Sequence, residues 1–447
     1  MKLNDLYHYQ EKAVKFILDN PKCALWLGMS LGKTVSTLTA IVKLYESKEI
    51  KKVLIVAPLR VCNSVWEQES RLWDHTRHLT FCNLAGGKAN RVKAATSKAD
   101  IFLINRETIH MLLFEYSKRW NWDMIVIDES SSVKNQKSQR FKALKKVISF
   151  TKRMVQLTGT PATNSLEDIY SQIYLLDQGE RLGRTLTAFR SLYFTQKYNG
   201  FGYQLRSESC ADTIHSKVKD IVISMQTEDY LELPPVKYVE REIILSPAIF
   251  KKYKDFEKDF IYELNSEKSI DAPNIAILQN KLSQTANGTM YDEDRNIINI
   301  HSEKLDELEV MVEEAQGEPI LLAYNYKHDM QRILDKFPQA ELVGKNAETI
   351  ERWNSGEIPM LLGHPMSLSH GVNMQNGGHI MIWYGLPWSL ELYQQFNARL
   401  HRTGQKNQVS IYHLIAQDTV EQKILKVLGN KDLQQQSLLN ALKYEMG

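Results

Sequence analysis

The sequence has little cysteine and no long apolar run, and both shortages limit what the protein can be. Its 447 residues include only four cysteines, Cys23, Cys62, Cys82 and Cys210, with no C-x-x-C pair and no histidine at zinc spacing. Scattered thiols in so long a chain are typical of reduced, buried side chains. No apolar stretch approaches the ~20 residues that span a bilayer, and the N-terminus has no signal-peptide core. We therefore expect a cytoplasmic protein without disulfides, structural zinc or membrane segments.

An excess of charge of one sign is also missing. The 56 Lys and Arg residues face 53 Asp and Glu residues, which gives a net charge of +3. This balance neither indicates nor excludes nucleic-acid binding, because a basic groove can be hidden in a balanced total. The share of hydrophobic residues, 43%, is that of an ordinary globular protein and excludes disorder and collagen-like repeats. At roughly 150 residues per domain, we expect about three units or two large ones.

Short β-branched apolar runs recur between helical patterns and fall into two groups. Continuous apolar runs, as opposed to alternating ones, are typical of parallel strands covered on both faces. With helices between them, they predict an α/β fold with two parallel sheets. The first group comprises residues 53–56, 101–104, 124–127 and 154–157, and the second comprises 319–322, 360–362, 379–383 and 409–412.

The stretch from about residue 166 to 304 is poor in strand patterns and is predicted to be mainly helical. Its clearest linker signal is Leu233-Pro234-Pro235, since paired prolines interrupt helix and strand alike. We therefore predict a first lobe over residues 1–235, with a helical insertion at about 167–230. The second lobe would span residues 236–447, with a helical insertion at about 247–283.

A glycine-containing turn at residues 28–34 joins an apolar strand to a helix that is predicted to begin near Lys33. A phosphate needs close backbone N–H groups, a cation and a free helix N-terminus, and Gly28-Met29-Ser30-Leu31-Gly32-Lys33-Thr34 offers all three. Gly32 would let the backbone approach, Lys33 would reach the β- and γ-phosphates, and the Thr34 hydroxyl would bind Mg²⁺. The alternative to a phosphate-binding loop is a Gly-Lys-Thr turn that simply precedes a helix.

Two carboxylates follow the strand at residues 124–127, where open α/β sheets bind their ligands. Asp128 would bind Mg²⁺ and Glu129 would polarise the attacking water. After the next strand, Leu157-Thr158-Gly159-Thr160-Pro161 forms a turn that could sense the γ-phosphate. A solvated acidic turn and a plain loop are the alternatives for these two segments.

In the second half, Arg399 and Arg402 are three residues apart and are predicted to share one face of a helix. Two guanidiniums on one face suit a phosphoryl group whose charge spreads in the transition state. A solvated basic face is the alternative.

Together these segments resemble helicase superfamily two, and specifically its Swi/Snf (sucrose-non-fermenting) family of double-stranded-DNA translocases. The similarity spans nearly the whole chain, and the wording around Arg399 is specific to that family. Besides the segments above, it rests on Tyr9-Gln10, Val56-Ala57-Pro58, Lys134-Asn135, Leu157-Thr158-Gly159-Thr160-Pro161 with Asn164, Leu233-Pro234-Pro235, Ser302-Glu303-Lys304-Leu305, and Gln395 with Arg399, Arg402 and Gly404-Gln405.

The resemblance implies two RecA-like lobes with ATP and Mg²⁺ in the cleft between them. It implies nucleotide binding by Gln10 and by Gly28, Met29, Ser30, Leu31, Gly32, Lys33 and Thr34. It gives Glu129 the role of catalytic base, and makes Gln395, Arg399 and Arg402 catalytic, the two arginines as fingers. Lobe closure on ATP would then move the protein along a duplex by its phosphates.

Three segments depart from the family pattern. Gly28 replaces an acid and Ser30 replaces a glycine in the phosphate-binding loop. Ser130-Ser131 replaces the Ala-His of D-E-A-H, which removes an imidazole that usually couples the lobes. Residues 367–373 lack two glycines of the family's motif V. These changes put the coupling of hydrolysis to movement in doubt, more than hydrolysis itself.

Candidate nucleic-acid contacts are Arg60, Arg106 and Asn164, which fall at or after strand ends on the expected DNA-facing edge. The leading interpretation is a DNA-stimulated ATPase that translocates on double-stranded DNA. A strand-separating DNA or RNA helicase and a nucleotide-gated DNA-binding adaptor with weak hydrolysis are the alternatives. The compact length resembles phage or bacterial members, so the cell would be prokaryotic or phage-infected, and a partner protein or the insertions would supply specificity.

Overall fold

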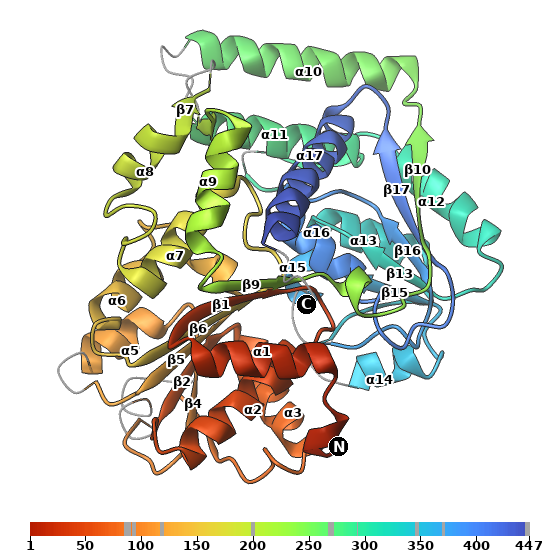
Figure 1. The fold of residues 1–447 in the computed structure, drawn as a ribbon. Helices are drawn as coiled ribbons and strands as arrows, with labels where there is room; N and C mark the ends of the chain where they lie inside the picture. The colour runs from red at the N-terminus through yellow and green to blue at the C-terminus, as the bar shows by residue number, and fades with distance from the viewer. Residues whose placement is uncertain are drawn as a thin grey trace. The chain divides into compact units, whose positions relative to one another are not determined.

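A computed structural model describes residues 1–84, 91, 95–116, 120–197, 202–266, 272–292, 294–344, 348–368 and 372–442. The chain divides into two units (Figure 1). The first contains Met1–Leu231 and the chain from Lys431 onward, and the second contains Glu232–Asn430. Among the described residues, no helix is long and apolar enough to cross a membrane.

The first unit is built on a seven-stranded sheet in the order β3-β4-β2-β5-β6-β1-β9, with every neighbouring pair parallel. All four runs predicted to be strands in this half lie in it. Its strands are β1 (Lys22–Leu27), β2 (Val53–Ala57), β3 (Phe81–Asn83), β4 (Ile101–Asn105), β5 (Met124–Asp128), β6 (Arg153–Thr158) and β9 (Val222–Met225).

Alternate side chains of these strands enter two separate cores, one on each face of the sheet. Cys23, Leu25 and Leu27 of β1 belong to one core, whereas Ala24 and Trp26 belong to the other. Figure 1 shows one set of helices on each face of the sheet. The first core is covered by α1 (His8–Asp19), α2 (Lys33–Glu46) and α3 (Trp66–Leu72), and the second by α5 (Ile109–Tyr116), α6 (Gln139–Val147) and α7 (Ile169–Asp177).

The stretch 167–230 contains the predicted helices but is not wholly helical. Beyond α7, it forms α8 (Leu186–Tyr193) and α9 (Glu208–Val218), and between them the antiparallel pair β7 (Phe194–Gln196) and β8 (Tyr203–Leu205). It then supplies β9, which pairs with β1 at the edge of the main sheet. The sequence pattern missed β9 because its four residues, Val-Ile-Ser-Met, are too few to distinguish from a helix segment.

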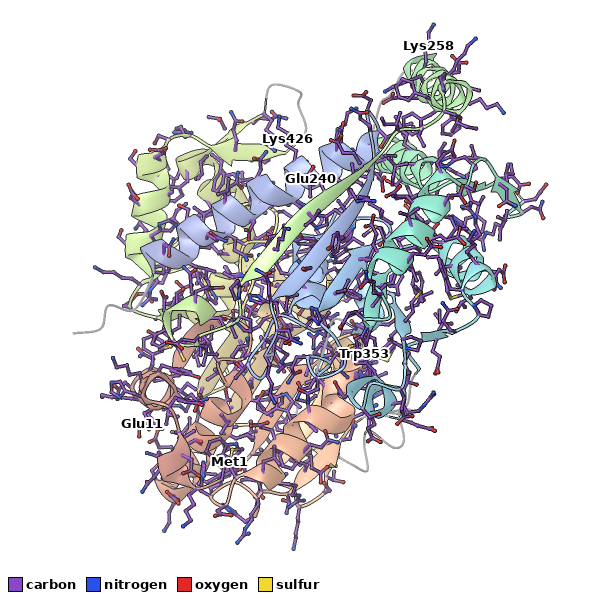
Figure 2. All side chains as sticks on the ribbon, turned by 90° about the vertical axis from the view of Figure 1, so that its right-hand side faces the viewer. Met1, Glu11, Glu240, Lys258, Trp353 and Lys426 are labelled. Carbon is purple, nitrogen blue, oxygen red and sulfur yellow. The ribbon has the colours of Figure 1, made fainter. Side chains whose placement is uncertain are left out.

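The second unit is built on a six-stranded parallel sheet in the order β10-β17-β16-β13-β15-β14. All four predicted runs of this half are strands of it. Its strands are β10 (Val236–Ile243), β13 (Ile320–Ala323), β14 (Ala340–Leu342), β15 (Met360–Gly363), β16 (Ile380–Trp383) and β17 (Val409–Ala416). Figure 2 shows Glu240 on the edge strand β10. The two parallel sheets are the fold class that the sequence predicts.

Helices flank this second sheet, and Trp353 is fully buried against it (Figure 2). An antiparallel pair, β11 (Thr289–Tyr291) and β12 (Ile297–Asn299), follows the insertion. The helices are α10 (Pro247–Ser266), α11 (Ala272–Ala286), α12 (Glu303–Glu314), α13 (Lys327–Lys336), α14 (Glu348–Asn354), α15 (Pro365–Leu368), α16 (Leu390–Asn397) and α17 (Val420–Ala441).

Helix α17 takes part in both units. Val420, Ile424 and Leu428 pack in the core of the second unit, whereas Leu438 and Leu439 pack in a core of the first. The division therefore differs from the predicted one, which placed all of 236–447 in the second lobe. The sequence could not reveal that α17 belongs to both units. An amphipathic pattern shows that one side of a helix is buried, but not which unit buries it.

A buried ion pair lies in the core of the second unit. The Lys304 ammonium, which is completely buried, bonds to the Glu421 carboxylate and to Asn287 Oδ1 at 2.8 Å. Glu421 also accepts the Ala416 N–H at 2.9 Å. The pair thus joins the start of α12 to the start of α17 and the end of β17.

We expect Lys304→Met to lower the free energy of unfolding of the second unit by about 3–5 kcal/mol, because it leaves Glu421 buried without its cation. The double variant Lys304→Met with Glu421→Gln should lose clearly less, since the amide still accepts from Ala416 and carries no charge. Urea unfolding followed by tryptophan fluorescence measures both. Equal losses in the single and double variants would show that the charge pair is not what stabilises this core.

Candidate nucleotide-binding and catalytic site

The carboxyl ends of β1, β6 and β5 lie side by side in the first sheet. Strand β6 pairs with β1 on one side and with β5 on the other, all in parallel. The segments that follow these strands therefore share one edge of the sheet: the loop 28–32 after β1, Gly159 after β6, and Glu129 after β5. The topology brings together three motifs that are far apart in sequence.

The loop after β1 has the backbone shape of a phosphate-binding turn. Gly32 has a φ of +71° and immediately precedes α2, whose first two residues are Lys33 and Thr34. A Cβ at Gly32 would lie 2.2 Å from Nε2 of Gln10, so only glycine fits between that side chain and the helix. Gln10 is itself buried, and its Oε1 accepts the Tyr7 N–H at 3.0 Å. The predicted nucleotide-binding residues Gln10, Gly32, Lys33 and Thr34 are thus neighbours.

The Lys33 ammonium lies over the loop that it belongs to. It donates to the carbonyl oxygens of Leu27 at 2.9 Å and Gly28 at 3.2 Å. Burial lowers the pKa of Lys33, and the nearby carboxylates of Glu129 and Asp128 oppose that shift. A cation facing two carboxylates at the end of a helix is the charge pattern that a nucleoside triphosphate with a divalent cation would complete.

The two carboxylates differ in their surroundings. Burial raises the pKa of Asp128, while the Lys33 ammonium and a hydrogen bond from Trp66 oppose the rise. The Trp66 indole N–H donates to Asp128 Oδ2 at 3.0 Å. Glu129 has a left-handed backbone, with a φ of +55°, and the Thr158 hydroxyl donates to its Oε2 at 3.5 Å. A strained non-glycine residue at a strand end is a common mark of a functional site.

Oxygen ligands suitable for Mg²⁺ are present at this edge. Mg²⁺ usually takes one or two protein oxygens and completes its shell with phosphate and water. Asp128 and the Thr34 hydroxyl offer such a pair. Among the residues that the structure describes, no cluster of three or more His, Cys, Asp and Glu side chains could hold a metal by itself. Asp128 and Thr34 stay the predicted ligands of a cation that would arrive with a nucleotide.

The three candidate nucleic-acid contacts follow strands β2, β4 and β6, at the same carboxyl edge of the sheet. Their surroundings in the protein differ. Arg60 follows β2, and burial lowers its pKa. Arg106 follows β4 and donates to Glu107 Oε1 at 2.9 Å. Asn164 donates to Asp168 Oδ2 through Nδ2 at 3.2 Å and accepts from Lys431 Nζ at 3.1 Å. Their contact with nucleic acid stays a prediction.

In the second unit, Arg399 and Arg402 do not lie on a helix, contrary to the expectation from their spacing. Helix α16 ends at Asn397, and the N–H groups of Arg399 and Leu400 bond three residues back, to Phe396 and Asn397. The two guanidiniums nevertheless converge, because both donate to the Val372 carbonyl oxygen, at 2.9 Å and 3.3 Å. Turn geometry therefore brings these two side chains together.

Gln395 is buried near the end of α16. Its Nε2 donates to Glu391 Oε1 at 3.4 Å, and its Oε1 has no hydrogen-bond partner within the described chain. Arg402 Nε is likewise buried without a partner there. Of the segment 367–373 that resembles motif V, residues 369–371 lie outside the described residues.

The comparisons with known proteins agree on one family. The model of the SNF2-related domain matches residues 9–303. The chain belongs to the SNF2-related family. Protein p41 of Acyrthosiphon pisum secondary endosymbiont phage 1 is 34% identical over 97% of this chain and 98% of its own length.

Other relatives are more distant and longer. An uncharacterized ATP-dependent helicase of Mycoplasma genitalium is 24% identical over 96% of this chain, but only 42% of its own length is matched. Among solved structures, the SWI2/SNF2 ATPase core of Sulfolobus solfataricus in complex with double-stranded DNA is 21% identical. That comparison covers 98% of this chain and 93% of the other, with a TM-score of 0.46.

Two of the positions that depart from the family pattern, Gly28 and Ser130, have contacts in the structure that explain the residue found there. Gly28, where the family has an acid, packs against Thr227, and a Cβ there would lie 2.3 Å from the Thr227 hydroxyl. That hydroxyl donates to the Met29 carbonyl at 2.8 Å. Thr227 therefore braces the loop 28–32 from the segment after β9, and sequence reasoning missed it.

Ser130, where the family has alanine, is part of a buried polar network. Its hydroxyl donates to Gln172 Oε1 at 2.8 Å, and Gln172 Nε2 donates to the Pro161 carbonyl at 2.7 Å. Gln172 is completely buried on α7. One side chain thus connects the residue after Glu129 with the turn after β6. No sequence signal singled out Gln172.

Ser30, where the family has glycine, has a φ of +66°. We expect Ser30→Gly to raise the free energy of unfolding by up to about 1 kcal/mol, because glycine adopts this conformation without strain. Thermal unfolding measures the gain. Lys48→Gly is the matched control, since Lys48 has a φ of +63° in an exposed turn beyond the other end of α2. A destabilised Ser30→Gly beside a stabilised Lys48→Gly would mean that the serine hydroxyl supports the loop.

We expect Gln172→Leu to lower the free energy of unfolding by about 1–3 kcal/mol, because it leaves the Pro161 carbonyl and the Ser130 hydroxyl buried without a partner. Ser130→Ala should cost less, and adding it to Gln172→Leu should recover part of the loss. Chemical denaturation of the three variants measures this coupling. Strictly additive effects would show that the two side chains do not act together.

Proposed function

We propose that this protein is a DNA-stimulated ATPase that converts ATP hydrolysis into movement along double-stranded DNA. The observation that carries the proposal is the meeting of Lys33, Asp128 and Glu129 at one edge of a parallel sheet. Membership of the SNF2-related family supports it, since relatives in that family are named ATP-dependent helicases. The chain covers only 42% of the length of the Mycoplasma genitalium relative, so the proposal concerns the motor alone.

The residues of the first unit would bind and activate ATP. The N-terminus of α2 and the Lys33 ammonium would hold the β- and γ-phosphates, and Gln10 would contact the nucleotide from its place against Gly32. Thr34 and Asp128 would hold Mg²⁺, which neutralises phosphate charge when bound. Glu129 would accept a proton from the attacking water, and the Thr158 hydroxyl would orient its carboxylate.

The residues of the second unit would complete the reaction. Arg399 and Arg402 would donate to the γ-phosphoryl oxygens as charge develops on them, with their carbonyl anchor at Val372 exchanged for phosphate. Arg60, Arg106 and Asn164 would bind phosphates of the duplex backbone, which accounts for sequence-independent movement. Closure of the two units on ATP and opening after hydrolysis would supply the step.

The first test is ATP turnover without nucleic acid and with double-stranded DNA, single-stranded DNA or RNA. We expect stimulation by duplex DNA, and Lys33→Ala should abolish turnover because it removes the phosphate-binding cation. Triplex displacement by the wild-type protein would then show movement. Better stimulation by single strands or RNA would instead support a strand-separating helicase.

Two substitutions test the chemistry. We expect Glu129→Gln to lower kcat by about 10²–10⁴-fold while ATP binding persists, because the amide cannot accept the proton. Arg402→Lys keeps the charge but loses the planar fork, and should lower kcat by about 10³-fold or more. Single-turnover kinetics with a parallel binding assay separate the effects. Full turnover in Glu129→Gln would remove it as the base and favour a nucleotide-gated adaptor.

A further inference from the structure

Trp66 lies outside the motifs named above and contacts the candidate site through Asp128. Its indole N–H donates to Asp128 Oδ2 at 3.0 Å, across 62 positions of sequence. Its side chain is completely buried, in the core that also contains Ile55 and Val126. An indole has one N–H donor and no acceptor, so this bond is its whole polar role.

Trp66 lies at the junction of two helical segments. It is the first residue of α3 and directly follows a five-residue π-helical turn, Val61–Val65. Turns of this kind are rare and are frequently found at functional sites. Helix α3 lies with α1 and α2 on one face of the sheet (Figure 1). A rigid aromatic body packed there holds its N–H in a fixed direction toward the end of β5.

The Asp128 carboxylate is held by hydrogen bonds from the Trp66 indole and from the backbone of Glu129, the next residue in the chain, and of these two donors only the indole comes from a different element. The charges of Lys33 and Arg106 act on the carboxylate through space, and Lys33 itself is bonded to Leu27 and Gly28. The indole bond fixes which oxygen faces the core and leaves the remaining lone pairs of the carboxylate for a ligand. Hydrogen bonds of this kind to metal-binding carboxylates are known to tune the affinity of the site.

We propose that Trp66 is a positioning residue that orients the Asp128 carboxylate for the Mg²⁺ ion that arrives with the nucleotide. The proposal rests on the function proposed above and adds to it a residue that acts only through Asp128. Trp66 contributes a directed N–H and a rigid body, and it has no contact with substrate of its own.

The test compares Trp66→Phe, which keeps most of the aromatic bulk but lacks the N–H, with the wild-type protein. ADP binding is measured by calorimetry with Mg²⁺ and again with EDTA, so that no turnover is involved. We expect the wild-type protein to bind ADP more tightly with Mg²⁺. In Trp66→Phe, the apparent affinity for Mg²⁺ in the presence of ADP should fall by about 10-fold or more, with ADP affinity in EDTA unchanged.

Trp353→Phe is the matched control. Trp353 is also completely buried, and its indole N–H donates to the Met374 carbonyl at 2.8 Å in the other unit (Figure 2). Losing that bond should destabilise the protein to a similar degree and leave the Mg²⁺ effect in place. An undiminished Mg²⁺ effect in Trp66→Phe would overturn the positioning role alone. A wild-type protein without any Mg²⁺ effect would overturn the metal role of Asp128 and this inference with it.

A second measurement needs no change at Trp66. The wild-type protein labelled with 5-fluorotryptophan should give eight fluorine resonances, one for each tryptophan. Trp66 is identified as the resonance displaced by Asp128→Asn. We expect the same resonance to move when Mg²⁺ is added to the ADP complex. If it stays in place while ADP binding tightens, the indole does not sense the metal and the inference fails.

Discussion

The candidate site depends on a single strand order, in which β6 lies between β1 and β5. Lys33 and the two carboxylates are therefore separated by two strand spacings, or about 10 Å at the level of the sheet. The long lysine side chain crosses part of that gap, above Gly159 at the end of β6. A Cβ at Gly159 would lie 3.9 Å from Lys33 Nζ and 3.2 Å from the Leu27 carbonyl. Glycine at this point keeps the space open in which opposite charges face each other.

Two residues at this edge, Ser30 and Glu129, have left-handed backbones without being glycine. The strands behind them are almost fully buried and paired on both sides, which lets the fold tolerate local strain of order 1–3 kcal/mol. The buried bonds of Ser130 to Gln172 and of Met29 to Thr227 hold the residues beside each strained position. The carboxyl edge of the first sheet thus carries two strained residues on rigid strands. Local strain of this kind is expected where a protein holds side chains in place for function.

The sequence was sufficient for the fold class of two parallel sheets and for the family, although it missed single strands such as β9. Runs such as 53–56 and 124–127 are continuous and β-branched, so they indicated buried parallel strands, and the order of the motifs indicated the family. The residues that support the motifs could not be predicted. Trp66 meets Asp128, Gln172 meets Ser130 and Thr227 meets Met29 across 62, 42 and 198 positions, and no local pattern encodes such contacts. Spacing also misled at Arg399 and Arg402, because helix α16 ends at Asn397, before either arginine.

The assignment of the last part of α17 to the first unit means that the chain passes between the units twice, at Leu231 and again after Asn430. The first unit is then built from two separate pieces of polypeptide, whereas the second is continuous. A fragment that stopped at the paired prolines would expose the apolar side chains that Leu438 and Leu439 normally cover, and would lack the Lys431 partner of Asn164. The first unit becomes complete only when α17 has been synthesised, so its core closes after the second sheet has emerged.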